Sequence, residues 1–231
     1  MSTKIIGVSG SPINNSNTDR LLKHVLESSG LEYEIFKLSE MDIKPCKACK
    51  ACVNDNICKV NDDFPSVAEK IKLADGLVIA AYTPYSMIDG HTKALLERFF
   101  SFRHQNSLLQ EKYLVTIVSS MLDISRQATH QSIVFEAVAE RMNHVRALDI
   151  AGAPPCNTCG VGDECINSNV KLIYGPEAVA CAENFIPVEE QPVWNEGELV
   201  GKQLGDLINK KENYVPSDMT QTIMKLLENF M

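Results

Sequence analysis

The 231-residue chain has few aromatic residues, no excess of basic residues and no long apolar run. Its 22 Lys and Arg face 30 Asp and Glu, which argues against a general nucleic-acid binder because such proteins displace counterions with a basic surface. No apolar run reaches the roughly 18–20 residues that a membrane span needs. Residues 1–10 lead directly into a strand-like run without a signal-peptide cleavage pattern. We therefore expect a cytoplasmic protein that binds neither nucleic acid nor membrane.

Short apolar runs alternate with amphipathic stretches along the chain. The runs predict strands at 4–8, 33–38, 75–82, 113–120 and 145–153, and helical spacing predicts helices at 18–30, after Asp62 or Asp63, at 92–102, around 133–142 and around 199–208. Strands that alternate with helices favour right-handed crossovers and a doubly wound parallel sheet. Five such units fit the flavodoxin-like strand order 2-1-3-4-5, in which ligands lie at the carboxyl ends of the strands.

The chain divides into a core, two insertions and a terminal arm. We expect a flavodoxin-like domain over residues 1–212, with cysteine-rich insertions at 44–60 and 154–195. Residues 213–231 form a predicted C-terminal helical arm, in which Ser217 caps a helix with apolar residues at i, i+3, i+4 and i+7. We expect this arm to pack on a neighbouring subunit, although folding back on its own domain is the alternative.

The loop after the first strand lacks the two glycine-rich nucleotide motifs. It matches neither G-x-G-x-x-G nor G-x-x-x-x-G-K-[ST], which disfavours a dinucleotide site and a nucleotide triphosphatase. It instead brings hydroxyl and amide side chains to a helix N-terminus, where backbone N–H groups and the helix dipole favour a phosphate. A plain N-capped turn would use the same residue types. The candidate phosphate-binding residues are Ser9, Ser11, Pro12, Ser16, Asn17 and Thr18.

Two loops resemble those of a known group of flavoproteins. Gly10-Ser11-Pro12 followed by Ser16-Asn17-Thr18 resembles the phosphate loop of the NAD(P)H-dependent FMN reductase and iron-sulfur flavoprotein families. Thr83-Pro84-Tyr85-Ser86-Met87, which leads into Lys93–Phe99, resembles their second flavin loop. The resemblance implies that FMN is the cofactor. It also implies that Thr83, Pro84, Tyr85, Ser86 and Met87 form one wall of the site for its ring.

The loop after the fourth strand departs from that family pattern. Family members often carry glycines there, whereas residues 119–127 contain none. Arg126 could replace the missing amide donors at the flavin, but a solvated position at the start of a helix is the interpretation that we favour.

Eight cysteines are the most distinctive feature of the composition. Thiols seldom pair permanently in a reducing compartment, so clustered cysteines indicate metal or redox chemistry. The first cysteine group (Cys46, Cys49, Cys52 and Cys58) has a spacing that suits four thiolate ligands of one [4Fe–4S] cluster. Zinc, a disulfide switch and unmodified thiols are alternatives. The run also resembles the cluster motif of the iron-sulfur flavoproteins, which occupies the same position after the second strand.

The second cysteine group lies beyond the part of the chain that carries the resemblance. Cys156, Cys159 and Cys165 repeat a C-x2-C-x5-C spacing, and Cys181 is available as a fourth ligand. A second cluster, a zinc site, redox thiols and simple packing all remain open for this group. Four histidines have neither metal-ligand spacing nor an evident partner, and we expect them at the surface or in the core: His91, His104, His130 and His144.

These features together predict an FMN- and [4Fe–4S]-containing oxidoreductase. FMN performs the redox chemistry, so we expect no side chain to act as a catalytic acid, base or nucleophile. Ferredoxin or NAD(P)H is the expected electron donor, and Lys44, Lys47, Lys50 and Lys59 could dock an acidic carrier beside the cluster. The family resemblance implies a homo-oligomer, a dimer or tetramer, that brings one subunit's cluster near another's flavin. The alternatives are an NAD(P)H-dependent FMN or quinone reductase without a cluster, and a metal-stabilised redox sensor.

Overall fold

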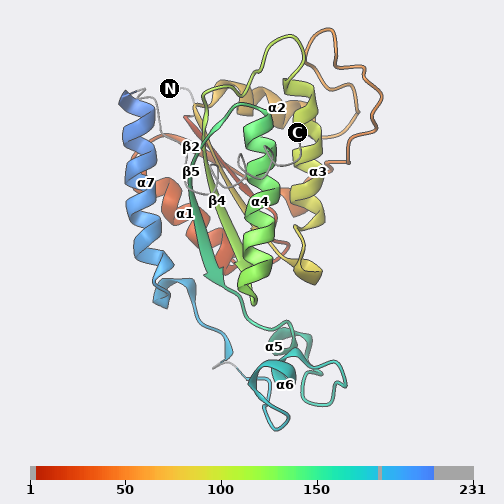
Figure 1. Cartoon of the computed structure of the whole chain (residues 1–231), viewed down its shortest axis with the longest axis vertical. Coiled ribbons are helices and arrows are strands. Elements are labelled where there is room, and N and C mark those ends of the chain that lie inside the picture. Colours follow the sequence, from red (N-terminus) through yellow and green to blue (C-terminus); the bar gives the residue numbers. More distant parts are fainter. Residues whose placement is uncertain (1–3, 182–183, 211–231) are drawn as a thin grey trace, which may run out of the picture.

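A five-stranded parallel sheet forms the centre of the protein (Figure 1). The computed structural model describes residues 4–181 and 184–210. The strands are β1 (Ile5–Ser9), β2 (Tyr33–Lys37), β3 (Gly76–Tyr82), β4 (Tyr113–Ser120) and β5 (Asn143–Ala151), in the order β2-β1-β3-β4-β5. This order confirms the predicted flavodoxin-like fold. The fully apolar strand β3 lies at the centre and the half-exposed strand β2 at an edge, as their sequence patterns predicted.

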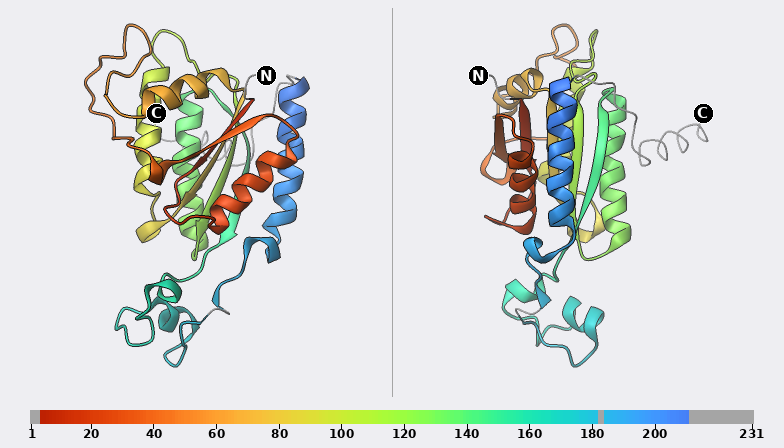
Figure 2. Two further views of the ribbon diagram at one scale, coloured as in Figure 1. Left: turned by 180° about the vertical axis from the view of Figure 1, so that it is seen from behind. Right: turned by 90° about the vertical axis from the view of Figure 1, so that its left-hand side faces the viewer.

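Helices cover both faces of the sheet (Figure 2). One face packs against α1 (Asn17–Ser28) and α7 (Val193–Lys210). The other packs against α2 (Phe64–Leu73), α3 (Gly90–Arg98) and α4 (Asp123–Ala139). Neighbouring strand residues serve opposite faces because side chains alternate along a strand. Burial on both sides makes the strands continuous apolar runs, which is why they were visible in the sequence.

Helix α7 lies directly on α1 because of its glycines. A Cβ atom on Gly201 would lie 2.3 Å from the Val25 carbonyl oxygen, and one on Gly205 would lie 2.2 Å from the Ser29 carbonyl oxygen. Any larger residue would push the two helices apart. The contact holds the C-terminal half of α1, which follows the first candidate loop, against α7.

One predicted helix is shorter than expected. The spacing predicted a helix over 92–102, but α3 ends at Arg98 and a 3₁₀ turn continues from Phe99 to Phe102. The tighter turn places both Phe99 and Phe102 in the core. Arg98 therefore lies where the helix changes its geometry, a position that matters for the cysteine loop described below.

The two cysteine-bearing segments lie at opposite ends of the sheet (Figure 1). The cysteine loop, residues 44–60, runs past the C-terminal end of α3, near the amino ends of the strands. The cysteine lobe, residues 154–187, extends from the carboxyl end of β5 and contains the short helices α5 (Cys156–Cys159) and α6 (Asn169–Tyr174). None of the described helices combines the length and apolar character of a membrane span. The predicted arm at 213–231 lies outside the described residues.

Candidate functional site

Three loops meet at the carboxyl edge of the sheet, where ligands bind in this architecture. Strands β1 and β3 are neighbours, with Ser9 opposite Ala80. The loops that follow them touch, because a Cβ atom on Gly10 would lie 2.1 Å from the Thr92 hydroxyl oxygen. The glycine therefore allows the first loop to lie on the cap of α3. The structure brings the candidate phosphate loop and the candidate ring loop together.

The first loop is organised by a carboxylate that the sequence analysis did not single out. Asp19 accepts a hydrogen bond from the Ser16 N–H at 3.1 Å, and the Ser16 hydroxyl accepts one from the Asp19 N–H at 3.1 Å. This capping box begins α1. Asp19 also accepts a bond from the Ser9 hydroxyl at 2.5 Å and pairs with the Lys37 ammonium at 2.6 Å. Ser9 and Ser16 thus shape the loop through their side chains.

The remaining residues of the first loop differ in their surroundings. The Asn17 amide donates to the Ile186 carbonyl at 3.0 Å, while its oxygen accepts the Val188 N–H at 3.1 Å. Ser11 and Thr18 are almost fully buried, and the Ser11 hydroxyl accepts the Ile13 N–H at 3.3 Å. The first N–H groups of α1 have no partner within the helix, as at any helix start. Backbone N–H groups, Ser11 and Thr18 are therefore the groups best suited to an anion.

The second loop presents exposed side chains in a constrained backbone. Tyr85 and Ser86 both adopt positive φ angles, 49° and 63°, which non-glycine residues seldom do. Tyr85 is fully exposed and Met87 is 61% exposed. Thr83 reaches across to β4 and donates to the Ser119 carbonyl at 3.4 Å. An exposed aromatic held by an uncommon backbone conformation is a feature found at ligand sites.

A buried carboxylate closes the second loop. Asp89 caps α3 and accepts hydrogen bonds from both the N–H and the hydroxyl of Thr92, each at 2.8 Å. Burial raises the pKa of Asp89, although the bonds from Thr92 and the Tyr82 N–H oppose the shift. The cap fixes the end of the loop that carries Tyr85 and Met87.

The third loop does not leave Arg126 in solvent. Arg126 lies in the first turn of α4, as expected, but only 14% of its side chain is exposed. It donates to the Ser120 carbonyl at 2.6 Å and lies 3.5 Å from the Asp149 carboxylate. The interpretation of a solvated arginine is therefore wrong, because the guanidinium satisfies the end of β4. Arg126 and Asp149 also border a groove of about 580 Å³ beside β5.

The cysteine loop gathers all four thiols of the first cysteine group around one small pocket. Lys47, Lys50, Lys59 and Arg98 line the same pocket. Cys52 is buried and Cys49 is exposed, while the other two are half-buried. Three non-glycine residues of this loop have positive φ angles, namely Ala48, Lys50 and Asn56. These reversals curl the chain so that cysteines three residues apart face one space.

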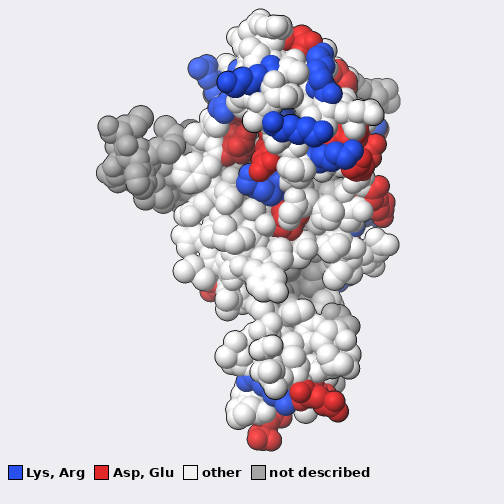
Figure 3. Space-filling model, turned by 90° about the vertical axis from the view of Figure 1, so that its right-hand side faces the viewer, with Lys and Arg blue, Asp and Glu red and all other residues white. Residues whose placement is uncertain are grey.

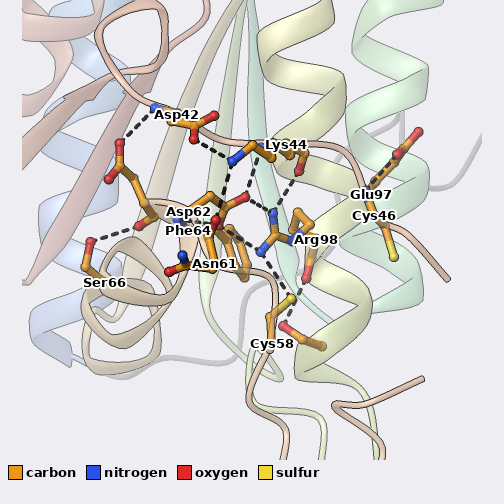
Figure 4. Close-up of polar contacts among 12 residues, drawn as sticks. Asp42, Lys44, Cys46, Cys58, Asn61, Asp62, Phe64, Ser66, Glu97 and Arg98 are labelled. Atoms are coloured by element: carbon orange, nitrogen blue, oxygen red, sulfur yellow. Dashed lines mark hydrogen bonds and ion pairs between the residues drawn. The ribbon is translucent and has the colours of Figure 1, made fainter. Parts of the chain in front are cut away.

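Arg98 ties this loop to the core of the protein (Figure 4). Its guanidinium donates to both oxygens of Asp62, at 2.5 and 3.1 Å, and to the Lys44 carbonyl at 2.8 Å. It also donates to the Cys58 sulfur at 3.1 Å. The side chains of Arg98 and Asp62 are both fully buried. Burial alone would raise the pKa of Asp62, but the bonds from Arg98 and backbone N–H groups hold it below its ordinary value.

The second cysteine group is also held by local contacts. Cys156 is buried, and its sulfur accepts the Asn169 N–H at 3.2 Å. The Cys165 sulfur accepts the Asn167 N–H at 3.3 Å. Backbone N–H groups, that of Val170 foremost, lower the pKa of Cys156 against the opposing effect of burial.

Comparison with models of known protein families shows to which family the chain belongs. A model of the NADPH-dependent FMN reductase family matches residues 3–152. The chain belongs to this family. The match ends where the cysteine lobe begins, so family membership says nothing about the second cysteine group.

Several curated proteins are similar to this family member. An iron-sulfur flavoprotein of Methanosarcina thermophila is 34% identical over 112 residues, which cover 47% of this chain and 59% of that protein. An iron-sulfur flavoprotein of Archaeoglobus fulgidus is 35% identical over 122 residues, which cover 52% of this chain and 60% of that protein. The chain thus spans about three-fifths of the length of these relatives.

Solved structures show the same fold at low sequence identity. The crystal structure of RosB with a bound riboflavin-phosphate derivative aligns with a TM-score of 0.58, covers 99% of this chain and 88% of that one, and is 15% identical. An NAD(P)H:quinone oxidoreductase from Methanothermobacter marburgensis aligns with a TM-score of 0.51, covers 94% of this chain and 100% of that one, and is 13% identical. At such identities the likeness concerns the fold alone.

The four thiols of the cysteine loop are a donor set of the type that holds an iron–sulfur cluster. Among the described residues, no three His, Cys, Asp or Glu side chains are arranged around one ion position. In a four-iron cluster each thiolate binds a different iron, so the sulfurs need not converge on one point. Arg98 and the Ala48 N–H, which lies 3.4 Å from the Cys46 sulfur, already donate to thiols of this group. Such donors stabilise thiolates.

Two of the histidines are core residues, as predicted. Thr116 lies between them, with its hydroxyl 2.8 Å from His130 Nδ1 and 3.1 Å from His144 Nε2. Burial, and then the neighbouring His130, lowers the pKa of His144 to about 4. His144 is therefore neutral at physiological pH and serves the packing of β4 and β5.

Proposed function

We propose that this family member is a flavin-dependent oxidoreductase that carries FMN at the carboxyl edge and a [4Fe–4S] cluster in the cysteine loop. Electrons pass between a reductant, ferredoxin or NAD(P)H, and an acceptor through these two groups. The single observation that carries the proposal is the shared pocket of Cys46, Cys49, Cys52 and Cys58 in a chain of the FMN reductase family.

The FMN phosphate is held by the first loop. Backbone N–H groups at the start of α1 donate to it, together with the hydroxyls of Ser11 and Thr18. Ser9, Ser16 and Asn17 contribute indirectly, since their side chains hold the loop and the start of α1 in shape. Lys37 neutralises Asp19, which would otherwise repel a phosphate dianion at this helix N-terminus. Pro12 limits the conformations of the loop.

The flavin ring lies along the second loop. Thr83, Pro84, Tyr85, Ser86 and Met87 form one wall, in which Tyr85 and Met87 offer exposed apolar surface. When bound, FMN accepts two electrons from a hydride donor and releases them singly. The chain's own part is to bind and orient the ring and to exclude water from it.

The cluster in the cysteine loop lies away from the flavin of its own chain. The loop runs beside the C-terminal end of α3, whereas the flavin loops lie at the opposite edge of the sheet. A homo-oligomer, a dimer or tetramer, would bring the cluster of one subunit near the flavin of another. Lys and Arg side chains lie among Asp and Glu side chains over the cysteine loop end of the molecule, while the surface directly below carries few charges (Figure 3). Lys47 and Lys50 beside the cysteine pocket could meet an acidic electron carrier, and the less charged surface below suits a contact between subunits.

Anaerobic purification with assays of FMN, iron and sulfide tests the cofactors. We expect one FMN and at least about four iron and four sulfide per chain. Bound FMN with rapid NAD(P)H oxidation and no iron would favour a simple FMN or quinone reductase. Zinc without sulfide and without flavin would favour a metal-stabilised sensor instead.

A double substitution tests the placement of FMN. Ser11→Ala with Thr18→Ala should weaken FMN binding about a hundredfold or more, because each hydrogen bond to a charged phosphate contributes roughly 1.5–3 kcal/mol. The iron content should stay unchanged. Ser132→Ala, which removes a hydroxyl from the middle of α4, is the matched control. Equal FMN affinity in all three proteins would mean that the phosphate lies elsewhere.

A further inference from the structure

The cysteine lobe is attached to two of the three loops at the carboxyl edge (Figures 1 and 2). Its first stem begins at Gly152, whose N–H donates to the Ser120 carbonyl at 2.8 Å, beside the third loop. Its second stem ends at Ile186 and Val188, which exchange hydrogen bonds with Asn17 in the first loop. The second cysteine group therefore lies at the same carboxyl edge of the sheet as the flavin loops, whereas the first cysteine group lies at the opposite edge.

The lobe has almost no hydrophobic core of its own. Among its described residues, the buried apolar side chains are Pro154, at the start of the first stem, Cys156 and Val170. Ile166 is 98% exposed and Leu172 is 81% exposed. A unit this small cannot be held by apolar burial on this scale, and small units of this kind use disulfides or metals instead. Its cysteines form no disulfide.

Backbone contacts draw the cysteines of the lobe toward one region. A Cβ atom on Gly162 would lie 2.9 Å from the Cys156 Cβ and 3.0 Å from the Ala180 Cβ, so the absence of a side chain lets three segments meet. Ala180, which precedes Cys181, also donates its N–H to the Asp163 carboxylate at 2.6 Å. The contacts join the segments that carry Cys156, Cys165 and Cys181.

The sulfurs already receive the type of hydrogen bond that supports thiolate ligands. Cys156 accepts the Asn169 N–H at 3.2 Å and lies 3.9 Å from the Ser168 hydroxyl. Cys165 accepts the Asn167 N–H at 3.3 Å. Hydrogen bonds to cluster sulfurs are one of the ways in which a protein tunes an iron–sulfur centre.

The spacing repeats that of the cysteine loop. Cys156-x2-Cys159-x5-Cys165 has the same intervals as Cys49-x2-Cys52-x5-Cys58. Soft thiolate sets select iron–sulfur clusters or zinc. Structural zinc usually takes two C-x2-C pairs separated by a longer spacer, whereas the lobe carries a single C-x2-C pair. A cluster spreads its thiolates over four irons and so tolerates their separation.

We propose that Cys156, Cys159, Cys165 and Cys181 bind a second [4Fe–4S] cluster, which holds the lobe together at the flavin edge. The proposal that these four thiolates form a binding site depends only on contacts within the lobe. Its place next to a flavin rests on the function proposed above. Each chain then carries one cluster at each end of the sheet, with the second nearer to its own flavin loops.

Iron and sulfide analysis of two matched variants tests this site. The variants are Cys159→Ser with Cys165→Ser in the lobe, and Cys49→Ser with Cys52→Ser in the loop. Cys159 is exposed and Cys165 half-buried, so their replacement leaves no cavity in a core. After anaerobic reconstitution with ferrous iron and sulfide, we expect about eight iron and eight sulfide in the unmodified chain and about four of each in either variant. FMN content and circular dichroism verify that each variant is folded.

The possible outcomes separate this proposal from the proposed function. About four iron and four sulfide in the unmodified chain, unchanged in the lobe variant, would overturn the second cluster. One zinc per chain that is lost in the lobe variant would overturn it as well. If the lobe variant loses iron and sulfide while the loop variant does not, the second cluster stands and the cluster of the proposed function fails. A difference in the electron paramagnetic resonance spectrum of the reduced protein between the two variants would independently support two distinct clusters.

Discussion

The two cysteine segments are built in opposite ways. The cysteine loop lies against α3 and the core, where Arg98 joins Asp62, the Lys44 carbonyl and Cys58. The cysteine lobe has three buried apolar side chains among its described residues, Pro154, Cys156 and Val170, and is attached to the sheet through its stems. We therefore expect the loop to keep its shape without a metal and the lobe to depend on one. Similar cysteine spacing thus does not imply a similar dependence on metal.

Removing Arg98 should cause the largest effect, and it tests the loop side of the comparison. Arg98→Ala leaves the fully buried Asp62 carboxylate without its partner, which should reduce the free energy of unfolding by about 3–5 kcal/mol. Chemical denaturation measures it. Lys59→Ala breaks the exposed Lys59–Asp55 pair nearby and should cost less than about 1 kcal/mol. Similar losses in both variants would show that the loop is not anchored through Arg98.

Iron removal should affect the two segments unequally. Trypsin can cleave in both segments, because Lys171 lies in the lobe and the exposed Lys50 lies in the loop. We expect chelation to accelerate cleavage at Lys171 about a hundredfold, since metal binding free energy is folding free energy in a unit without a core. Cleavage at Lys50 should accelerate by a smaller factor. Mass spectrometry of timed digests gives both rates, and equal acceleration would remove the distinction between the segments.

A pH experiment separates the stability of the sheet from that of the lobe. Burial raises the pKa of Glu140 to about 7, although Arg103 opposes the shift. Below about pH 4.5 the Glu140 carboxyl is protonated in both the folded and the unfolded chain, so its ionisation does not lower the free energy of unfolding. Between about pH 4.5 and 7 the unfolded chain ionises first, so stability falls as the pH rises.

The substitution Glu140→Gln removes this ionisation. It should stabilise the protein by about 2 kcal/mol at pH 8 and have little effect at pH 4.5, as measured by denaturant unfolding. Trypsin cleavage at Lys171 should not change in this variant. A constant difference at all pH values would mean that the effect comes from packing and not from the charge.

Loosening a stem of the lobe should give the smallest effect. Asn17→Ala removes the bonds to Ile186 and Val188, which should cost about 1 kcal/mol and increase hydrogen exchange at Val188. Asn143→Ala, which removes an exposed amide at the start of β5, is the control. If hydrogen exchange at Val188 is unchanged in Asn17→Ala, the stem is held by other contacts.

The fold followed from the sequence because each strand is buried on both faces. Continuous apolar runs such as 75–82 predicted strands, and helices between them left few possible topologies. The start of α1 was predicted to within one residue, and the capping box of Ser16 and Asp19 that fixes it is a local signal that the sequence analysis did not use. The lobe was not, because its short helices have no apolar periodicity over residues 154–187.

The site was predictable in its residue types but not in its contacts. Arg98 is one of 22 basic residues, and its partner Asp62 lies 36 positions earlier, so no local pattern links them. Ser9 and Asn17 were expected to contact a phosphate. Instead, the Ser9 side chain bonds to Asp19, and the Asn17 side chain bonds to the second stem of the lobe. Such long-range pairings depend on how the strands and loops meet in three dimensions.

An iron-edge anomalous difference map from crystals grown without oxygen is the most direct test of the account. The account predicts two iron sites per chain, one among Cys46, Cys49, Cys52 and Cys58 and one within the cysteine lobe. It also predicts flavin density between the loop at 9–18 and the loop at 83–87, on the side of the sheet that carries the lobe. A single iron site, iron outside the cysteine groups or flavin away from these loops would contradict it.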